Sequence, residues 1–401
     1  MQLRAEHSEP LHLTYCTNVH RGDTLSNAMD LLPRFAPLVK SVAPSQQNRI
    51  AWGLFLGCET VKEMDSSSSL TNELSTCMEQ NGTYALTMNA FPMSGFHEAV
   101  VKRGVYQPDW HQTDRVQHTL RTGRILANLP TRSSYQSIST MPGSFKAFGE
   151  ADLPAIAHNL VTVAQEFARI ESETGRRVVL AVEPEPGCTF ETTDEWITFF
   201  KDHLLPAATA ACKQHDVISE ELIRRHIGIC FDCCHQSVEF EDVADSLRQL
   251  IREGISVAKI QLSTALRCEN PARSPEAIHR LTSFDEPRYL HQVGAQARDG
   301  SITVFEDLSE YLQIAHSRDD ASCRVHFHVP IFEADLNDGL QTTRPDLEAV
   351  FRLIQSEPIT EHLEIETYSF DVLPNADGEA RLLSENIAQE YRFALSLLAQ
   401  P

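Results

Sequence analysis

The stretch HIGICFDCCHQSVEFED, residues 226–242, contains the pattern that decides the fold. An apolar run ends at Asp232, and His235 follows three residues later. An apolar run of this length that ends in a polar residue is typical of a buried parallel strand. Three cysteines lie in the same stretch, so either their sulfur atoms or the Asp-x-x-His pair could carry the chemistry.

Seven further runs of the same kind are spread along the chain, and helical patterns separate them. They cover residues 12–18, 50–56, 83–91, 135–141, 177–184, 257–263 and 363–368, and residues 324–332 are a ninth strand or a loop. Eight strands that alternate with helices predict an α/β protein with a (β/α)8 TIM barrel, a single domain over residues 1–401. An open doubly wound sheet is the alternative, but the segment after the first run, TNVHRGDTLSN, has one glycine and no phosphate-binding Gly-x-Gly-x-x-Gly turn.

The length beyond a minimal barrel falls in three segments. These segments, at about residues 62–80, 92–134 and 264–323, are expected to be loops inserted between strands and helices, with frayed helix ends as the alternative for residues 62–80. Since the active sites of TIM barrels are built from the loops after the strands, long insertions there are usually functional.

The composition restricts the partners. A formal net charge of −22 over 401 residues disfavours nucleic acid, whose phosphates require Lys and Arg, and indicates an acidic, soluble surface. The ten cysteines are scattered through apolar stretches, which indicates reduced thiols. The N-terminal residues lack the apolar core of a signal peptide, and no run is long enough to cross a membrane, so we expect a cytoplasmic protein without membrane insertion.

The cysteines are the weaker candidates for chemistry. Cys230 and Cys233 have C-x-x-C spacing, but an extended strand would place them on opposite faces, and the sequence has no second such pair. We interpret both as small apolar residues of the barrel wall. Asp232 and His235 can hold a divalent metal ion at the barrel mouth, or Asp232 can cap the next helical turn beside a surface histidine.

Two more strands end in carboxylates. Glu183 ends the strand in RVVLAVEPEPG, and in LEIETY the residues Glu364 and Glu366 share a face, with Glu366 at the rim. Each carboxylate alone could be a solvated strand end. Three of them at one barrel mouth require neutralisation, and Lys259 is the one cation of these strand bodies that could point the same way. A metal ion is the simpler source of positive charge.

The motifs AVEPEPG, CFDCCHQ and IETY resemble, in order and position, those of xylose isomerase-like barrels, which include ketose 3-epimerases, sugar isomerases and the endonuclease IV group (AP endonuclease family 2). A closer resemblance is to the metabolite traffic protein EboE family. It rests on HLTYCTNVHRGDTL, EPEPGCTFETTDE, DCCHQSVEFED, KIQLSTAL and HFHVPIF. This resemblance implies a barrel of that superfamily in a metabolite-export context, with possible partner proteins from an export gene cluster and no defined reaction.

The resemblance implies ligands for a divalent ion of Mn, Mg or Zn. These are Glu183, Asp232 and Glu366, completed by Gln261 or His328. The superfamily has a histidine where this chain has Gln261, an oxygen ligand more compatible with Mg²⁺ or Mn²⁺ than with Zn²⁺. Further candidates for substrate contact are His20, Asn89, Glu185, Lys259 and His326.

Three functions fit these patterns. The first is a metal-dependent isomerase or epimerase of a small polyol- or sugar-like metabolite, in which Glu183 and Glu366 exchange the proton and His235 orients a hydroxyl group. The second is a metal-dependent phosphoester hydrolase. The third is a non-catalytic binding or trafficking protein, which the EboE resemblance supports and which fits the presence of Gln261 in place of the superfamily's histidine.

Overall fold

A ring of eight parallel strands forms the centre of the computed structural model, which describes residues 10–43, 49–93, 95–212, 219–374 and 382–399. The strands are β1 (His12–Tyr15), β2 (Ile50–Phe55), β3 (Thr83–Asn89), β4 (Gln136–Thr140), β5 (Val178–Val182), β6 (Ile227–Asp232), β7 (Val257–Leu262) and β13 (His362–Ile365). Their order is β1-β13-β7-β6-β5-β4-β3-β2, and a parallel bridge between Cys16 and Gly53 joins the two ends. The predicted (β/α)8 TIM barrel is therefore confirmed, and its eight strands coincide with the eight apolar runs.

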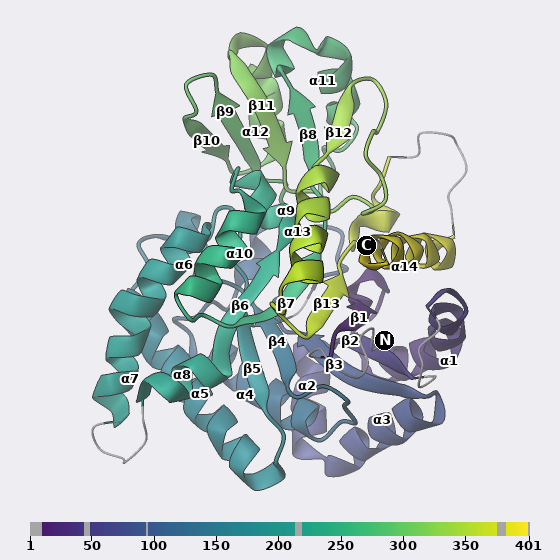
Figure 1. Ribbon diagram of the computed structural model, residues 1–401, viewed down its shortest axis with the longest axis vertical. Coiled ribbons are helices and arrows are strands. Elements are labelled where there is room, and N and C mark those ends of the chain that lie inside the picture. Colours follow the sequence, from purple (N-terminus) through teal and green to yellow (C-terminus); the bar gives the residue numbers. More distant parts are fainter. Residues whose placement is uncertain (1–9, 44–48, 94, 213–218, 375–381, 400–401) are drawn as a thin grey trace.

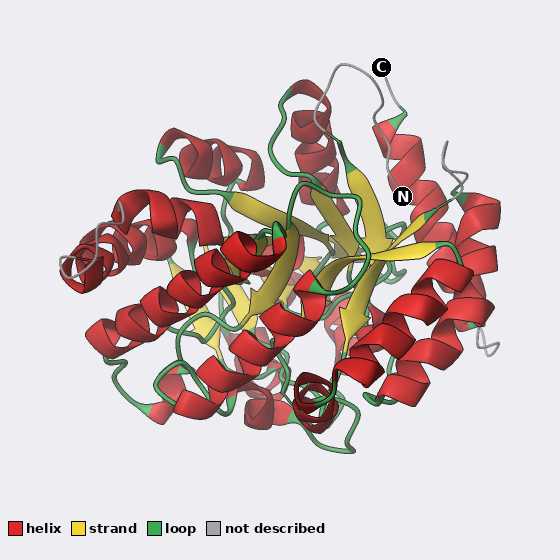
Figure 2. Cartoon of the chain, turned by 90° about the horizontal axis from the view of Figure 1, so that it is seen from below, coloured by secondary structure: helices red, strands yellow, loops and turns green. Residues whose placement is uncertain are grey.

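Helices surround the ring (Figure 2). They are α1 (Leu25–Val42), α2 (Cys58–Ser66), α3 (Ser68–Gln80), α4 (Thr113–Ala127), α5 (Leu153–Thr174), α6 (Thr193–Phe199), α7 (Leu205–Cys212), α8 (Ser219–His226), α9 (Cys233–Val238), α10 (Val243–Arg252), α13 (Arg344–Ser356) and α14 (Leu383–Leu398). Helix α5 shows how local sequence sets the ends: the Asp152 side chain accepts from Ala155 N, and Gly175 ends the helix at φ 69°. No helix in the described ranges is long and apolar enough to cross a membrane.

The segment expected as a loop at 264–323 instead folds, together with residues up to Thr342, as a small unit with its own sheet, above the barrel in Figure 1. Its elements are β8 (Leu266–Glu269), α11 (Pro275–Thr282), β9 (Val293–Ala297), β10 (Ile302–Phe305), α12 (Leu308–Ile314), β11 (Asp320–Val325) and β12 (Leu340–Thr342), and the antiparallel sheet has the order β10-β9-β11-β8-β12. Apolar side chains such as Leu281, Phe284 and Tyr311 form a separate core beneath this sheet. Of the ninth candidate strand, only residues 324–325 are extended, and the rest is a loop at the barrel mouth.

The segment at 62–80 also differs from the expected loop, because it belongs to α2 and α3. The serine run only marks the break between the two helices, and Leu74 and Met78 bury one face of α3. Within 92–134, a short 3-10 turn at Lys102–Tyr106 precedes α4. The expectation about a signal peptide rests largely on residues 1–9, which lie outside the described residues.

A buried ion pair lies in the barrel interior. Lys259 on β7 and Glu364 on β13 are both fully buried and form a hydrogen-bonded salt bridge. The Lys259 amine also donates to Ser139 Oγ at 3.1 Å. Lys259 therefore neutralises Glu364 within the barrel, and the carboxylates at the strand ends need another source of positive charge.

Candidate metal centre

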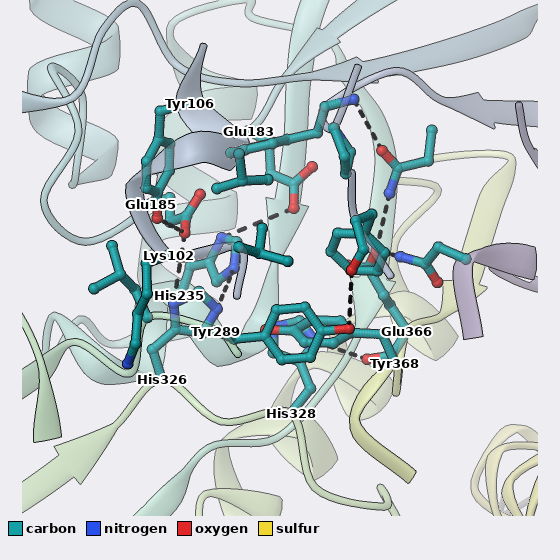
Figure 3. A pocket seen from close by; sticks show the side chains of 18 residues that line it. Lys102, Tyr106, Glu183, Glu185, His235, Tyr289, His326, His328, Glu366 and Tyr368 are labelled. Carbon is teal, nitrogen blue, oxygen red and sulfur yellow. Dashed lines mark hydrogen bonds and ion pairs between the residues drawn. The ribbon is translucent and has the colours of Figure 1, made fainter. Parts of the chain in front are cut away.

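Three carboxylates from three strands converge at the barrel mouth. Glu183 follows β5, Asp232 ends β6 and Glu366 follows β13, and each offers an oxygen atom within 4.8 Å of the other two. All three side chains are buried. Parallel strands end at the same rim of a barrel, so these residues, far apart in the sequence, form one cluster (Figure 3 labels Glu183 and Glu366).

Asp232 has two separate roles. Its Oδ1 atom accepts from the His235 backbone N–H at 2.9 Å and from Ser263 Oγ at 2.8 Å, which caps α9. Cys233 therefore begins a helix and does not continue the strand, contrary to the sequence interpretation, because the capping carboxylate starts a helical turn there. The second oxygen, Oδ2, accepts none of these hydrogen bonds and can act as a metal ligand in the cluster.

The imidazoles face the cluster with their Nε2 atoms. His328 donates from Nδ1 to the Glu366 carbonyl oxygen at 2.7 Å, and His235 donates from Nδ1 to the Pro184 carbonyl oxygen at 3.0 Å. A carbonyl oxygen only accepts, so Nδ1 carries the proton and Nε2 keeps a lone pair. This arrangement orients histidine ligands in metal sites.

Three buried atoms of the cluster have no hydrogen-bond partner among the described residues. They are Glu183 Oε2, Asp232 Oδ2 and His328 Nε2. All three atoms carry lone pairs, and a buried acceptor without a donor costs free energy. A cation bound between them would satisfy all three, so the residues present fit a divalent metal ion.

Burial controls the protonation of the cluster. It raises the pKa of Glu183 well above its usual value, with Glu366 and Asp232 adding repulsion, and it raises the pKa of Glu366 to about 8. Burial also lowers the pKa of His328, and it lowers the pKa of His235 to about 4. The imidazoles are therefore neutral near pH 7, the form that binds metal ions.

A second cluster adjoins the first. Glu185, His235 and His326 offer ligand atoms within 4.8 Å of one another, and Cys234 lies within the same distance of His326 and His328. Burial raises the pKa of Glu185 to about 8 and of the Cys234 thiol well above its usual value. Cys234, which the sequence interpretation did not single out, is thus the cysteine beside the imidazoles. Cys230 and Cys233 belong to no such group among the described residues.

Gln261 contacts Glu366 through its amide. The amide nitrogen donates to Glu366 Oε2, and the amide oxygen accepts from Cys230 Sγ at 2.7 Å. In this arrangement Gln261 holds the carboxylate in place. Asn18 and Asn89 both donate to Glu366 Oε1 at 3.0 Å, so every oxygen of this carboxylate has an amide donor.

The other expected substrate contacts lie in different places. Asn89, Glu185 and His326 line the pocket at the barrel mouth. His20 is not among the pocket-lining residues, and its ring bonds Tyr15 Oη at 2.9 Å and packs on Phe35. Lys259 is not among them either, because it is buried with Glu364 deeper in the barrel.

Sequence reasoning missed several pocket residues. Asn18 and Tyr368 are the last residues of the predicted runs 12–18 and 363–368, and this position was a usable signal. Phe96, Tyr106 and Tyr289 lie in the long insertions, where no periodic pattern distinguishes them from other loop residues. The described pocket therefore has an aromatic part that could not be predicted from the residues at the strand ends.

Comparisons with known proteins concern the fold. No protein-family model and no curated protein sequence matches the chain. Solved structures similar to it include an IOLI protein with a bound zinc atom (11% identity, TM-score 0.48, 97% of this chain and 98% of that chain). A second is a xylose isomerase domain protein from Planctomyces limnophilus (11% identity, TM-score 0.48, 98% of this chain and 98% of that chain). A third is a D-tagatose 3-epimerase-like protein (13% identity, TM-score 0.48, 97% of this chain and 98% of that chain). The structural neighbours are thus xylose isomerase-like barrels, and at this identity the likeness says nothing about reaction or substrate.

Proposed function

We propose that the chain is a metal-dependent isomerase or epimerase that acts on a small polyol- or sugar-like metabolite. The observation that supports this most strongly is the set of unpartnered buried atoms Glu183 Oε2, Asp232 Oδ2 and His328 Nε2. They come from three separate segments of the chain and converge with Glu366 at the barrel mouth, where TIM-barrel chemistry takes place.

The donor set determines the chemistry. Carboxylates with one imidazole suit Mg²⁺, Mn²⁺ or Zn²⁺. Such an ion, when bound by Glu183, Asp232, Glu366 and His328, supplies Lewis acidity toward a carbonyl or hydroxyl oxygen of the substrate.

In this proposal, Glu183 and Glu366 carry out the proton transfer. Glu183 and Glu366 follow different strands, β5 and β13, and both border the pocket. We assign one as the base that removes a proton from the carbon next to a carbonyl group and the other as the acid that returns it. The amides of Asn18, Asn89 and Gln261 hold Glu366 in orientation. His235 would orient a substrate hydroxyl group through Nε2.

Metal analysis of the purified protein tests this proposal. Wild type should retain about one or two equivalents of a divalent ion after supplementation with Mn²⁺, and the Glu183→Gln/Asp232→Asn double variant should lose it. Candidate ketoses should then incorporate solvent deuterium at the carbon next to the carbonyl group only with the loaded wild type. A folded wild-type protein that neither holds nor binds a divalent ion would refute the proposal.

The second cluster favours a second candidate function. Glu185, His235 and His326 would hold another ion beside the first, and paired ions serve phosphoester hydrolysis. Hydrolysis of a phosphorylated metabolite without deuterium exchange would favour this candidate.

The EboE resemblance supports a third possibility, a cytoplasmic binding component of a metabolite-export system with partner proteins. Ligand binding without either reaction would favour it.

A further inference from the structure

The pocket at the barrel mouth has two chemically different parts (Figure 3). The floor is polar and consists mainly of Glu183, Glu185, His235, His326, His328 and Glu366. The wall is apolar and includes Phe91, Phe96, Val101, Val105, Tyr289 and Tyr368. A ligand that contacts both parts must join an oxygen-bearing head to an apolar body.

Of the two tyrosine hydroxyl groups of the wall, that of Tyr289 is occupied by the protein. Tyr289 donates to the Phe96 carbonyl oxygen at 3.3 Å, and Tyr106, between wall and floor, donates to Glu185 at 2.6 Å. The rings also pack on one another, with centroids 5.2 Å apart for Phe96 and Tyr289 and 5.0 Å for Tyr289 and Tyr368. This packing holds the rings in place, so the wall presents mainly carbon to a ligand.

The apolar wall begins directly beside the candidate metal ligands. The ring of Tyr368 lies 4.8 Å from the ring of His328, centroid to centroid, and Tyr368 stands two residues after Glu366. A ligand whose head sits on the floor therefore meets the wall within a few bonds.

The charges of the pocket disfavour an anionic ligand. Lys102 is the one Lys or Arg among the described residues that line the pocket, and its amine is already bound to Asp307 at 2.5 Å. The floor carries the carboxyl groups of Glu183, Glu185 and Glu366. Apart from a bound metal ion, whose charge the carboxylates offset, a phosphate or carboxylate group would meet no free cationic side chain there.

We propose that the substrate is uncharged and amphipathic, with a hydroxyl- or carbonyl-bearing head on the floor and an aromatic or alicyclic body packed on Phe91, Phe96, Tyr289 and Tyr368. The inference about the head depends on the proposed function, whereas the inference about the body depends only on the residues of the apolar wall. Free sugars and phosphorylated sugars are the substrates that this pocket disfavours.

Three compounds that share one head test the inference. They are glycerol, glycerol 3-phosphate and 3-phenoxypropane-1,2-diol, each titrated calorimetrically into the full-length protein supplied with Mn²⁺. The phenoxy compound should bind at least about tenfold more tightly than glycerol, because its ring leaves water for the wall. Glycerol 3-phosphate should bind no more tightly than glycerol.

A matched pair of variants locates the effect. Val101 lines the pocket and is half-buried, whereas its neighbour Val100 is 61% exposed and does not line it. Val101→Asp should abolish the preference for the phenoxy compound, and Val100→Asp should keep it. Both positions lie outside the barrel core, so both variants are expected to fold.

The outcomes separate this inference from the proposed function. Equal affinities for glycerol and the phenoxy compound, tighter binding of the phosphate, or no binding of any of the three would overturn it, even if the protein holds its metal. A phenoxy preference lost in Val101→Asp alone would support it. If that preference appears in a protein that binds no metal, the proposed function fails while the apolar subsite stands.

Discussion

His235 and His326 face each other across the pocket floor, with their Nε2 atoms 3.1 Å apart. His235 Nδ1 donates to the Pro184 carbonyl oxygen, and His326 Nδ1 donates to Gln292 Oε1 at 2.7 Å. The orientation of Gln292 is set because its amide nitrogen donates to the Pro186 carbonyl oxygen. Both Nε2 atoms therefore carry lone pairs, which repel at this distance unless a positive charge lies near them. Burial lowers the pKa of His326 well below its usual value, so near pH 7 a metal ion is a better source of that charge than a proton.

His326→Ala should reduce the number of metal ions bound. The variant removes one ligand of the second cluster and leaves Glu183, Asp232 and Glu366 in place. We expect the affinity for a second equivalent to fall at least tenfold, measured by elemental analysis and Co²⁺ titration. His158→Ala, at an exposed position on α5, is the control. Identical stoichiometry in the wild type and His326→Ala would contradict the prediction.

Gln261→Leu should weaken metal binding about 10- to 100-fold, because it removes an amide donor that orients the Glu366 carboxylate. The change keeps the volume of the side chain within the barrel. Metal affinity can be measured by competition with a chelator. Gln313→Leu, at an exposed position on α12, is the matched control. An unchanged affinity in Gln261→Leu would show that Glu366 needs no such donor.

The double variant Cys230→Ala/Cys233→Ala should bind as much metal as the wild type. Burial raises the pKa of both thiols well above its usual value, so neither is a thiolate near pH 7. Elemental analysis of both proteins checks this. A loss of metal in a double variant that still folds would support the hypothesis that the cysteines form a thiolate metal site.

Gly53→Ala should destabilise the barrel by about 2 kcal/mol or more, or prevent folding. A Cβ atom at Gly53 would overlap the Glu364 carboxylate and lie 2.7 Å from the Tyr15 carbonyl oxygen. Either the chain shifts or Glu364 leaves Lys259. Urea denaturation measures the loss, and Gly104→Ala, where nothing lies within 4 Å of the added atom, is the control. Equal midpoints of urea denaturation for Gly53→Ala and Gly104→Ala would contradict the predicted destabilisation.

Glu390→Gln should change the pH dependence of stability. Glu390 accepts from Thr367 Oγ1 at 2.6 Å, and burial raises its pKa from 4.5 to about 8. The folded state then holds a proton that the unfolded state releases, so the stability contributed by this group falls as pH rises between about 4.5 and about 8. Chemical denaturation at several pH values should show a flatter profile in the Gln variant than in Glu385→Gln, an exposed control. Parallel profiles would show that Glu390 ionises in the folded protein.

Local sequence was sufficient for the barrel and for its strand-end carboxylates. Buried parallel strands must be apolar over their length, and this made the eight runs visible, including the one that ends at Asp232. Strand ends of a barrel share one rim, so Glu183, Asp232 and Glu366 could be grouped without coordinates. For residues 62–80 the expectation of a loop was wrong and the alternative of helix ends was nearer, because the serine run made the apolar face of α3 hard to recognise.

Contacts between distant segments decided the rest. The sequence by itself determined the barrel and the three carboxylates, because both follow from short-range patterns. Only the tertiary structure paired Lys259 with Glu364, turned the Nε2 atoms of His235 and His326 toward each other, and assembled Phe96, Tyr289 and Tyr368 into one wall. Such arrangements depend on tertiary contacts between side chains that are far apart in the sequence. The periodicity of the sequence does not specify those contacts.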